Sequence, residues 1–312
     1  MNDEEIIRCV HEAVGGDRNR AKLETLGGKQ GLIVCRVTLP GSGSFIFKAV
    51  KESCRRELTL TASLAALGTP SLPKVIEYRE DCARSLYWII MEDAGPCRLA
   101  DSPTVENYIA TAEALANLQM KFIESPEGRR ELNILSIGPS EWDNIALSTI
   151  DMVEKPGSRS VAAKRRGLLD SLWRTTDVAR DTVSLPLTLV HGDLHAGNIA
   201  LRGPSAVVLL DWGSAYIGAA FLGLAELLWP AARHLKNQSD LGRIRKAYFT
   251  VWSAQLGKPG RLEQPFAACQ VLAHLSLLHE SLRKPEMYDD FAVAAAVGRY
   301  LDAVRKWERI AG

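Results

Sequence analysis

The stretch from Thr188 to Gly218, TLVHGDLHAGNIALRGPSAVVLLDWGSAYIG, constrains the fold of this chain more than any other part of the sequence. It places two histidines, two aspartates and an asparagine between short apolar runs. Polar groups buried beside apolar strands cost free energy unless each is hydrogen-bonded or takes part in binding or catalysis. The stretch therefore indicates either a well-satisfied turn inside a hydrophobic core or the working centre of the protein.

The local pattern of this stretch predicts short strands with polar residues at their ends. The apolar runs LTLV and AVVLL end directly at His191 and Asp211, as in a small hairpin that carries functional groups at its strand ends. The turn-forming residues RGPS follow Asn198 and reverse the chain, so Asp211 can return to the side of Asn198. Asp193 precedes Asn198 by five residues in a loop that contains glycine.

Asp193, Asn198 and Asp211 together would form a site made only of oxygen ligands. Hard divalent cations such as Mg²⁺ prefer such ligands, whereas soft metals need sulfur or several imidazoles, which this loop does not gather. Mg²⁺ that is held by few protein groups usually completes its coordination with substrate phosphates. The three residues therefore predict a magnesium site that also receives a phosphate-bearing ligand.

The first third of the chain contains residues that suit such a ligand. Gly27, Gly28 and Gly31 would let the backbone approach a polyphosphate closely. Lys48 ends the apolar strand sequence SFIFK, where a cation needs an anionic partner that phosphate oxygens or a glutamate could provide. Taken singly, these features also have structural explanations, as an ordinary turn and a lysine whose ammonium reaches solvent.

The pattern of apolar residues divides the chain into a strand-rich part and a helical part. Strands are predicted at 32–39, 44–50 and 85–93, the first two joined by the turn PGSG, with a helix at 54–68 that ends at Gly68. Further helices are predicted from Ser102 as cap and Pro103 as first helical residue to about 119, and near 160–180, 221–235, 240–256, 262–282 and 288–310. The Gly-Pro step near residue 95 is the expected hinge, so the predicted α+β architecture has lobes at 1–94 and 95–312.

Composition excludes several classes of partner and location. The formal net charge of the 312 residues is +1, which argues against a nucleic acid polymer or an anionic membrane as the main ligand. No apolar run approaches the roughly 18 residues that span a bilayer, and the N-terminus is acidic and amphipathic, unlike a signal peptide. The six cysteines are scattered without a CxxC spacing, as expected of a cytoplasmic protein with reduced thiols.

The central motif resembles the catalytic core of kinases. HGDLHAGN has the His-x-Asp-x-x-x-x-Asn order of a protein-kinase catalytic loop, and DWG stands where those enzymes have Asp-Phe-Gly. The form HGDLHAGNI…VVLLDWGSAYIG resembles the aminoglycoside phosphotransferase and choline kinase family more closely than protein kinases. The resemblance implies a bilobal, protein-kinase-like fold and transfer of the γ-phosphoryl group of ATP, with Mg²⁺, to a hydroxyl of a small molecule.

For the catalytic loop, the resemblance implies a role for each matching residue. Asp193 would be the catalytic base, and Asn198 and Asp211 would hold the magnesium ions that bridge the nucleotide phosphates. His191 would brace the loop rather than react. His195 is a further supporting residue, although an ordinary structural histidine is an equally good explanation.

For the N-terminal lobe, the resemblance implies nucleotide binding. Lys48 would contact the α- and β-phosphates and pair with Glu57 from the following helix, since Glu52 lies too close to the strand end. The glycines at 27, 28 and 31 would approach the phosphates. Adenine would lie against the hinge and bond to the backbone of Met91, Glu92 and Asp93. The C-terminal lobe would then carry catalysis and bind the acceptor.

The sequence departs from the family pattern at three positions. Ala196 stands where the family often has proline, and Gln119 where many members have histidine after a leucine. Gly223 replaces the aspartate of the Asp-Leu-Ala that often follows DWG. The missing carboxylate is expected to affect the fold or the acceptor pocket, whereas the residues for nucleotide and metal are all present.

The acceptor and two alternative functions depend on the C-terminal region. Residues 212–312 carry more Lys and Arg than Asp and Glu, which argues against a polycationic aminoglycoside. Glu226 and Glu280 could still line a pocket, and the aromatic residues Trp229, Trp252 and Tyr288 could form a wall for a choline-like cation. A nucleotide-binding pseudokinase would have lost its key lysine or aspartates, and a Ser/Thr protein kinase would need an Ala-Pro-Glu motif that this sequence lacks.

Overall fold

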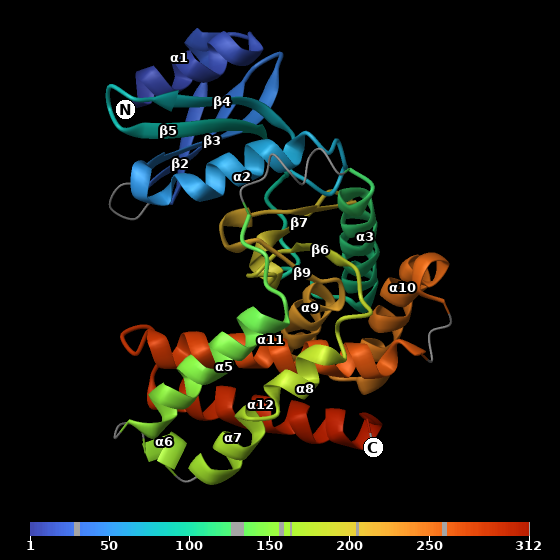
Figure 1. Cartoon of the computed structure of the whole chain (residues 1–312). Coiled ribbons are helices and arrows are strands. Elements are labelled where there is room, and N and C mark those ends of the chain that lie inside the picture. The colour runs from blue at the N-terminus through green and yellow to red at the C-terminus, as the bar shows by residue number, and fades with distance from the viewer. Residues whose placement is uncertain are drawn as a thin grey trace.

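The chain forms a β-rich N-lobe and a larger, mostly helical C-lobe, which confirms the predicted α+β architecture (Figure 1). The computed structural model describes residues 1–27, 32–125, 134–155, 159–162, 164–203, 206–257 and 261–311. No helix within these ranges is both long enough and apolar enough to cross a membrane.

The N-lobe is built on a five-stranded antiparallel sheet in the order β1-β2-β3-β5-β4. Its strands are β1 (Lys22–Gly27), β2 (Leu32–Leu39), β3 (Gly43–Lys51), β4 (Val75–Asp81) and β5 (Leu86–Glu92). The predicted strands at 32–39, 44–50 and 85–93 and the first hairpin are confirmed, with Leu39 paired to Gly43. The sequence did not predict β1 and β4, because few of their side chains are buried and the apolar pattern is weak.

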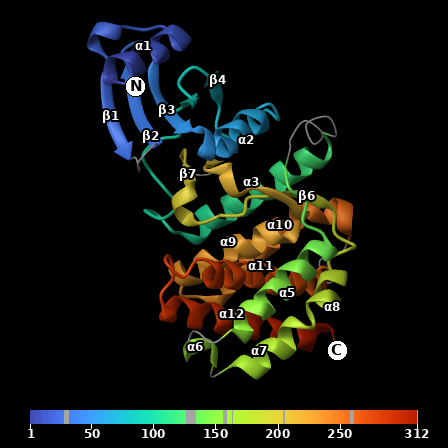
Figure 2. The ribbon, with the colours of Figure 1, turned by 60° about the vertical axis from the view of Figure 1, so that its left-hand side comes forward.

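Two helices cover opposite faces of this sheet. On one face, α1 (Asp3–Val14) packs Ile6 and Val10 against a cluster that includes Phe47 and Trp88. On the other lies α2 (Arg55–Ala65), between the sheet and the C-lobe (Figure 2). Because successive side chains of a strand point to opposite faces, Lys48 faces away from the side that buries its neighbour Phe47. The lysine therefore points to the side of the sheet that carries α2.

The C-lobe consists of helices around one large core. They are α3 (Val105–Ile123), α5 (Pro139–Glu154), α6 (Arg159–Ala162), α7 (Arg165–Leu172), α8 (Thr175–Arg180), α9 (Phe221–His234), α10 (Gln238–Leu256), α11 (Glu263–Arg283) and α12 (Asp290–Ala311). In both views α11 and α12 lie side by side below α9 (Figures 1 and 2). The described ranges also contain the short 3₁₀ helices η1 (Arg18–Arg20), η2 (Glu52–Cys54), η3 (Ala196–Asn198) and η4 (Trp212–Ser214).

Two predictions about the helices need correction, and one helix was not predicted. The first C-lobe helix is capped by Thr104, whose hydroxyl accepts from the Asn107 amide at 3.2 Å, and not by Ser102. The single helix predicted near 160–180 is three short helices, α6, α7 and α8. The apolar residues keep a helical spacing across the breaks between them, which is why the sequence predicted one continuous helix. The helix α5 was not predicted, although Pro139 at its first position is a typical start signal.

The polar stretch forms two small antiparallel ladders. β6 (Leu187–Val190) pairs with β9 (Tyr216–Ala219), whereas β7 (Ile199–Leu201) pairs with β8 (Val207–Leu209). The runs LTLV and AVVLL are therefore both strands, but they do not pair with each other. The predicted reversal after Asn198 is confirmed, because β7 and β8 run antiparallel to each other.

The hinge between the lobes is bonded to this polar stretch. The Leu99 amide donates to the Ile199 carbonyl at 2.9 Å, and the Leu201 amide donates to the Cys97 carbonyl at 3.0 Å. Gly95 has a φ of +91°, a conformation that favours glycine. The segment that joins the lobes therefore runs along β7 and fixes the hairpin relative to the end of β5.

An aromatic cluster around Phe221, the first residue of α9, forms the centre of the C-lobe core. Its ring lies 5.1–6.4 Å from the rings of Tyr248, Phe249, Trp252 and Phe266. Trp252 is fully buried in this cluster, so the expectation that it could line an acceptor wall is wrong. The cluster ties α9 to α10 and α11, and thereby supports the helix that follows β9.

We expect Phe221→Ala to lower the free energy of unfolding by about 3–5 kcal/mol, since it removes a ring from a closed core. Phe291 is 83% exposed, and Phe291→Ala is the matched control, with an expected change within about 0.5 kcal/mol. Chemical denaturation followed by circular dichroism measures both. Equal losses in the two variants would contradict the central position of Phe221.

Candidate active site

Lys48 and Glu57 form an ion pair between the sheet and α2. Lys48 lies in the middle of β3, opposite Val34 on β2 and Ile89 on β5. The two side chains are only 14% and 21% exposed. Burial raises the pKa of Glu57, and the nearby Asp211 raises it further, whereas Lys48 opposes the shift. Lys48 thus offsets part of the cost of burying the Glu57 carboxylate.

A cavity of about 240 Å³ lies between the lobes beside this pair. It brings together residues from β3, α2, the hinge and the polar hairpin: Lys48, Glu57, Met91, Glu92, Asp93, Asn198 and Asp211. Apolar walls come from both lobes, with Val34 and Ile46 from the sheet and Leu210 from the hairpin. Gly27 ends β1 next to Leu26, which also lines the cavity. Gly28 and Gly31 lie outside the described residues.

The hinge at the edge of this cavity is held by several polar contacts. The Glu92 amide donates to the Lys74 carbonyl at 3.0 Å, and the Asp93 amide to the Ser44 carbonyl at 3.1 Å. The Asp93 carboxylate accepts from Arg36 at 2.6 Å. A base that bonds to this segment would therefore have to use backbone groups other than these two amides.

Asn198 and Asp211 lie next to each other at the open end of the β7–β8 hairpin. The Leu210 amide donates to the Asn198 carbonyl at 2.8 Å, so Asp211 follows directly on the residue that pairs with Asn198. Asp211 adopts a left-handed backbone conformation, with φ +63° and ψ +69°. Non-glycine residues rarely do so, and such strain is commonly found at functional sites.

The oxygen atoms of this pair suit a hard cation. Among the residues described, the Asp211 carboxylate makes no hydrogen bond or ion pair, and it lines the cavity together with Asn198. The Asn198 amide nitrogen donates to the Asp193 carbonyl at 3.0 Å, which leaves the amide oxygen to accept or to coordinate. No cluster of three or more His, Cys, Asp or Glu side chains that could hold a metal occurs in the described ranges. A carboxylate and an amide oxygen fit Mg²⁺ that completes its shell with phosphates.

Arg56, which the sequence did not single out, binds the DWG segment to α2. Its guanidinium donates to the carbonyls of Gly213 and Ala215, both at 2.7 Å. A Cβ on Gly213 would lie 3.2 Å from the Cβ of Glu57, so the glycine allows the close approach. Nothing in the sequence distinguishes Arg56 from its neighbour Arg55, because only the direction of α2 decides which one reaches the segment.

His191 supports the catalytic loop as a neutral, buried ring. Its Nε2–H donates to the Leu210 carbonyl at 2.8 Å, and its Nδ1 accepts from the Asp193 amide at 3.3 Å. The imidazole packs against the Trp212 ring at a tilt of 45°, with 4.5 Å between ring centroids. Burial lowers the pKa of His191 to about 4, so the ring stays uncharged at neutral pH. This geometry suits a residue that holds the loop in place by hydrogen bonds rather than one that transfers a proton.

Asp193 projects from the loop with an exposed carboxylate. Its Oδ2 lies 3.9 Å from Nε2 of His195, whose Nδ1 accepts from the Gly197 amide at 3.0 Å. Burial of part of the side chain raises the pKa of Asp193, and Asp211 adds to the shift, while His195 opposes it. His195 thus caps η3 and faces Asp193.

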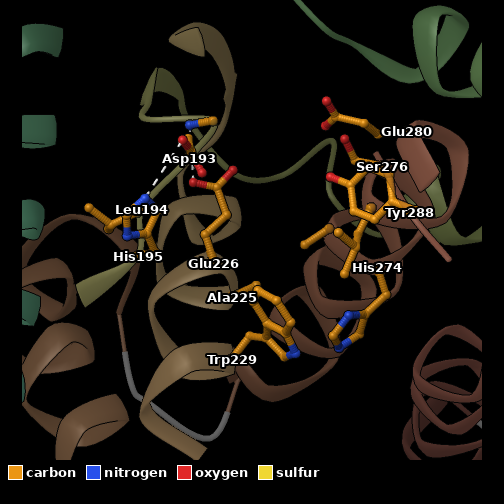
Figure 3. A pocket seen from close by; sticks show the side chains of 13 residues that line it. Asp193, Leu194, His195, Ala225, Glu226, Trp229, His274, Ser276, Glu280 and Tyr288 are labelled. Atoms are coloured by element: carbon orange, nitrogen blue, oxygen red, sulfur yellow. Dashed lines mark hydrogen bonds and ion pairs between the residues drawn. The ribbon is translucent and has the colours of Figure 1, made fainter. Parts of the chain in front are cut away.

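A second cavity of about 240 Å³ opens on the other side of Asp193 (Figure 3). Asp193, His195 and Glu226 lie at one end, with Glu280 and Tyr288 across from them and Trp229 and His274 at the far end. The expected Glu226, Glu280, Trp229 and Tyr288 all line this cavity.

Glu226 holds the loop from beneath. Its Oε2 accepts from the Gly192 amide at 3.1 Å. Burial raises the pKa of Glu226 to about 8, and the neighbouring Asp193 contributes, so the side chain is mostly protonated at neutral pH. A single acid inside the apolar run FLGLAELLWP is a signal from which the sequence could have indicated this structural role.

The two unusual residues Gln119 and Gly223 lie in contact. The Gln119 amide donates to the carbonyls of Leu189 at 2.9 Å and Ala220 at 3.1 Å, and its oxygen accepts from the Tyr248 hydroxyl. A Cβ on Gly223 would lie 3.2 Å from the Gln119 nitrogen, tighter than an ordinary contact. An uncharged amide network therefore occupies the place where the family pattern suggests a histidine and an aspartate.

The β-rich lobe, the Lys–Glu pair and the polar hairpin at the lobe boundary define a kinase-like class of fold. The chain belongs to the phosphotransferase enzyme family (APH), whose model matches residues 22–263. No curated protein sequence matches at a significant level.

Solved structures with a similar fold cover nearly the whole chain. Choline kinase from Cryptosporidium parvum Iowa II has a TM-score of 0.69 at 12% identity, covering 99% of this chain and 97% of that one. A thermostable mutant of aminoglycoside phosphotransferase APH(4)-Ia, in a ternary complex with AMP-PNP and hygromycin B, has a TM-score of 0.62 at 17% identity. The match covers 96% of this chain and 98% of that one. Plasmodium vivax ethanolamine kinase has a TM-score of 0.60 at 14% identity, and the match covers 98% of this chain and 88% of that one.

We expect Gly192→Ala to distort the catalytic loop. Gly192 has a φ of +80°, and an added Cβ would lie 2.2 Å from the Ser214 carbonyl oxygen, so the loop and the DWG segment must separate. The expected loss in the free energy of unfolding is about 3 kcal/mol or more. Gly203, with a φ of +85° and open space around it, is the control, and Gly203→Ala should cost about 1 kcal/mol. Denaturant unfolding compares them, and equal losses would disprove the clash.

We expect Glu226→Gln to change how stability depends on pH. Because the pKa of Glu226 rises from 4.5 to about 8 on folding, the native state holds the proton more tightly, and its stabilising effect is lost as pH rises through 8. Stability of the unchanged protein relative to the variant should therefore fall between pH 4.5 and 8. Thermal unfolding across this range measures the difference, and parallel curves would contradict the shift.

Proposed function

We propose that this protein transfers the γ-phosphoryl group of ATP, with Mg²⁺, to a hydroxyl of a small molecule, with Asp193 as the catalytic base. The observation that carries the proposal is the convergence of Lys48, Glu57, Asn198 and Asp211 on one cavity. Asp193, whose backbone carbonyl accepts from Asn198, lines a second cavity. These residues come from segments far apart in the chain. The ternary complex of the similar aminoglycoside phosphotransferase with AMP-PNP and hygromycin B supports the same division into two sites.

The N-lobe, residues 1–94, would bind the nucleotide. Lys48, oriented by Glu57, supplies a cation for the α- and β-phosphates, and Asn198 and Asp211 supply oxygen ligands for Mg²⁺. The base would lie between the apolar residues Val34 and Leu210, near the backbone of Met91 to Asp93. When bound, ATP would supply the phosphoryl group, and its Mg²⁺ would neutralise the charge that develops on the phosphate oxygens.

Asp193 would orient the acceptor hydroxyl and take its proton. The hydroxyl oxygen forms the new bond to phosphorus as the bond to the ADP oxygen breaks, and the proton passes to the Asp193 carboxylate. The Asn198 side chain holds the Asp193 backbone, and His191 and Glu226 hold the adjacent loop atoms. These contacts keep the carboxylate in position, which is the main catalytic requirement when the transition state is loose.

The acceptor would be bound by the C-lobe, residues 95–312, in the cavity beyond Asp193. Its charge is moderate, because Glu226 is mostly protonated at neutral pH and Glu280 pairs with Lys284 at 2.6 Å. Trp229 and Tyr288 add apolar surface with polar edges. This lining suits a small hydroxyl compound of low charge better than a polycation.

The six free thiols agree with a cytoplasmic location.

We expect Asp193→Asn to abolish transfer and to spare MgATP binding. The amide cannot accept the hydroxyl proton, so turnover should fall by about 10²–10⁴-fold. ADP release is measured with MgATP across aminoglycosides, macrolides, choline, ethanolamine, homoserine and pentoses, and MgATP binding by calorimetry. Asp151→Asn, an exposed carboxylate on α5, is the control.

Near-normal turnover in Asp193→Asn would disprove the role of Asp193. Tight MgATP binding with no transfer to any acceptor, in the unchanged protein, would favour the pseudokinase. Transfer to Ser- or Thr-containing peptides alone would favour a protein kinase.

A further inference from the structure

A third cavity of about 620 Å³ lies behind the acceptor cavity, among α9, α10, α11 and α12. The two cavities share the side chains of Ala225, Trp229 and His274 as a common wall. Trp229 and His274 lie beside each other at that end of the acceptor cavity in Figure 3. Nothing in the proposed phosphoryl transfer uses this third cavity.

The charged side chains that line this cavity are mostly basic. Arg245, Arg299 and Lys306 carry three positive charges, against one negative charge on Asp302. The Asp302 carboxylate turns outward, where it is 76% exposed and pairs with Arg305 at 2.9 Å. The side chains that line the cavity therefore carry an excess of positive charge, which suits an anion such as a phosphate monoester.

Arg299 lacks an acidic partner in the described part of the chain. Its Nε is buried and has no hydrogen-bond partner, and no ion pair to a described carboxylate forms. The guanidinium lies 5.1 Å from the Trp229 ring, and a second guanidinium, that of Arg233, lies 5.3 Å from the same ring. A buried donor without a partner costs free energy, so an unpaired cation here is costly without an anion.

Lys306 is in a similar position on the same helix. Its ammonium donates to the Gln270 side-chain oxygen at 3.0 Å and forms no ion pair with the carboxylates that the structure describes. Arg245 does have a partner, Glu263 at 3.0 Å. Burial lowers the pKa of both Lys306 and Arg299, and a neighbouring guanidinium lowers each further. Two half-buried cations thus converge on one cavity, and neither forms an ion pair with a described carboxylate, although Asp302 also lines the cavity and Glu263 lies near enough to Lys306 to raise its pKa.

We propose that this basic cavity binds the phosphate group of a small molecule, held by Arg299 and Lys306. The guanidinium offers a planar fork of donors and the ammonium a point charge, a combination that suits phosphate oxygens. The phosphate belongs either to a separate ligand or to an arm of the acceptor that passes Trp229. The second source rests on the proposed function, whereas the site itself does not.

The test is calorimetric titration of the full chain with inorganic phosphate. The expected result is binding with Kd of about 1 mM or tighter, weakened about tenfold or more by Arg299→Gln and by Lys306→Gln. Arg180→Gln removes an exposed guanidinium of α8 and should leave binding unchanged. Lys48→Gln should also leave it unchanged, because the phosphate does not bind in the cleft. Thermal unfolding verifies that each variant is folded.

Three results would overturn the proposal. They are no phosphate binding to the unchanged protein, binding by Arg299→Gln and Lys306→Gln that is as tight as that of the unchanged protein, or loss of binding in Lys48→Gln alone. The effect of inorganic phosphate on acceptor kinetics then shows whether the bound phosphate belongs to the acceptor or to a separate ligand. Either result is consistent with the proposed site. Phosphate that raises the KM of an acceptor identifies an acceptor arm, whereas phosphate that binds without changing that KM identifies a separate ligand. Absence of turnover would test the proposed function and leave the binding result intact.

Discussion

The ion pair between Lys48 and Glu57 is the interaction on which the rest of the site depends. It sets the position of α2 against the sheet, and the adjacent Arg56 then reaches the carbonyls of Gly213 and Ala215. A half-buried ion pair contributes little net stability, but loss of one partner leaves a charge without compensation. Sheet, helix and DWG segment therefore form one unit, and Asp211 faces the same cavity as Lys48 because of it.

Below this unit, the loop that carries Asp193 is supported mainly by uncharged groups. His191 is neutral because burial lowers its pKa, and Glu226 is mostly protonated because burial raises its pKa. The Gln119 amide joins β6 to the start of α9 without any charge. Neutral supports avoid the cost of burying ions, and they leave the Asp193 carboxylate exposed on the wall of the second cavity.

The sequence predicted two kinds of element: strands in which buried and exposed side chains alternate, and helices in which apolar side chains recur every three or four residues. β2 and β3 were predicted because every second residue is buried, and the helices α9 to α12 because their apolar residues recur at helical spacing. β1 and β4 lie at the edges of the sheet and bury little, so their pattern is weak. The partners of β6 and β8 could not be predicted, since several short apolar runs are equally able to pair.

The sequence by itself determined which polar groups gather at the hairpin, because Asp193, Asn198 and Asp211 lie within one short stretch whose turns bring them together. It also indicated that Lys48 needs an anionic partner, either phosphate oxygens or a glutamate, since a lysine in an apolar strand is costly alone. Only the tertiary structure decided that Arg56 rather than Arg55 holds the DWG segment, and that Gln119 meets Gly223. It also decided that Arg299 and Lys306 share a cavity with Trp229. These contacts join helices that are distant in the chain, and their packing depends on side-chain shape and helix direction, which local spacing does not encode.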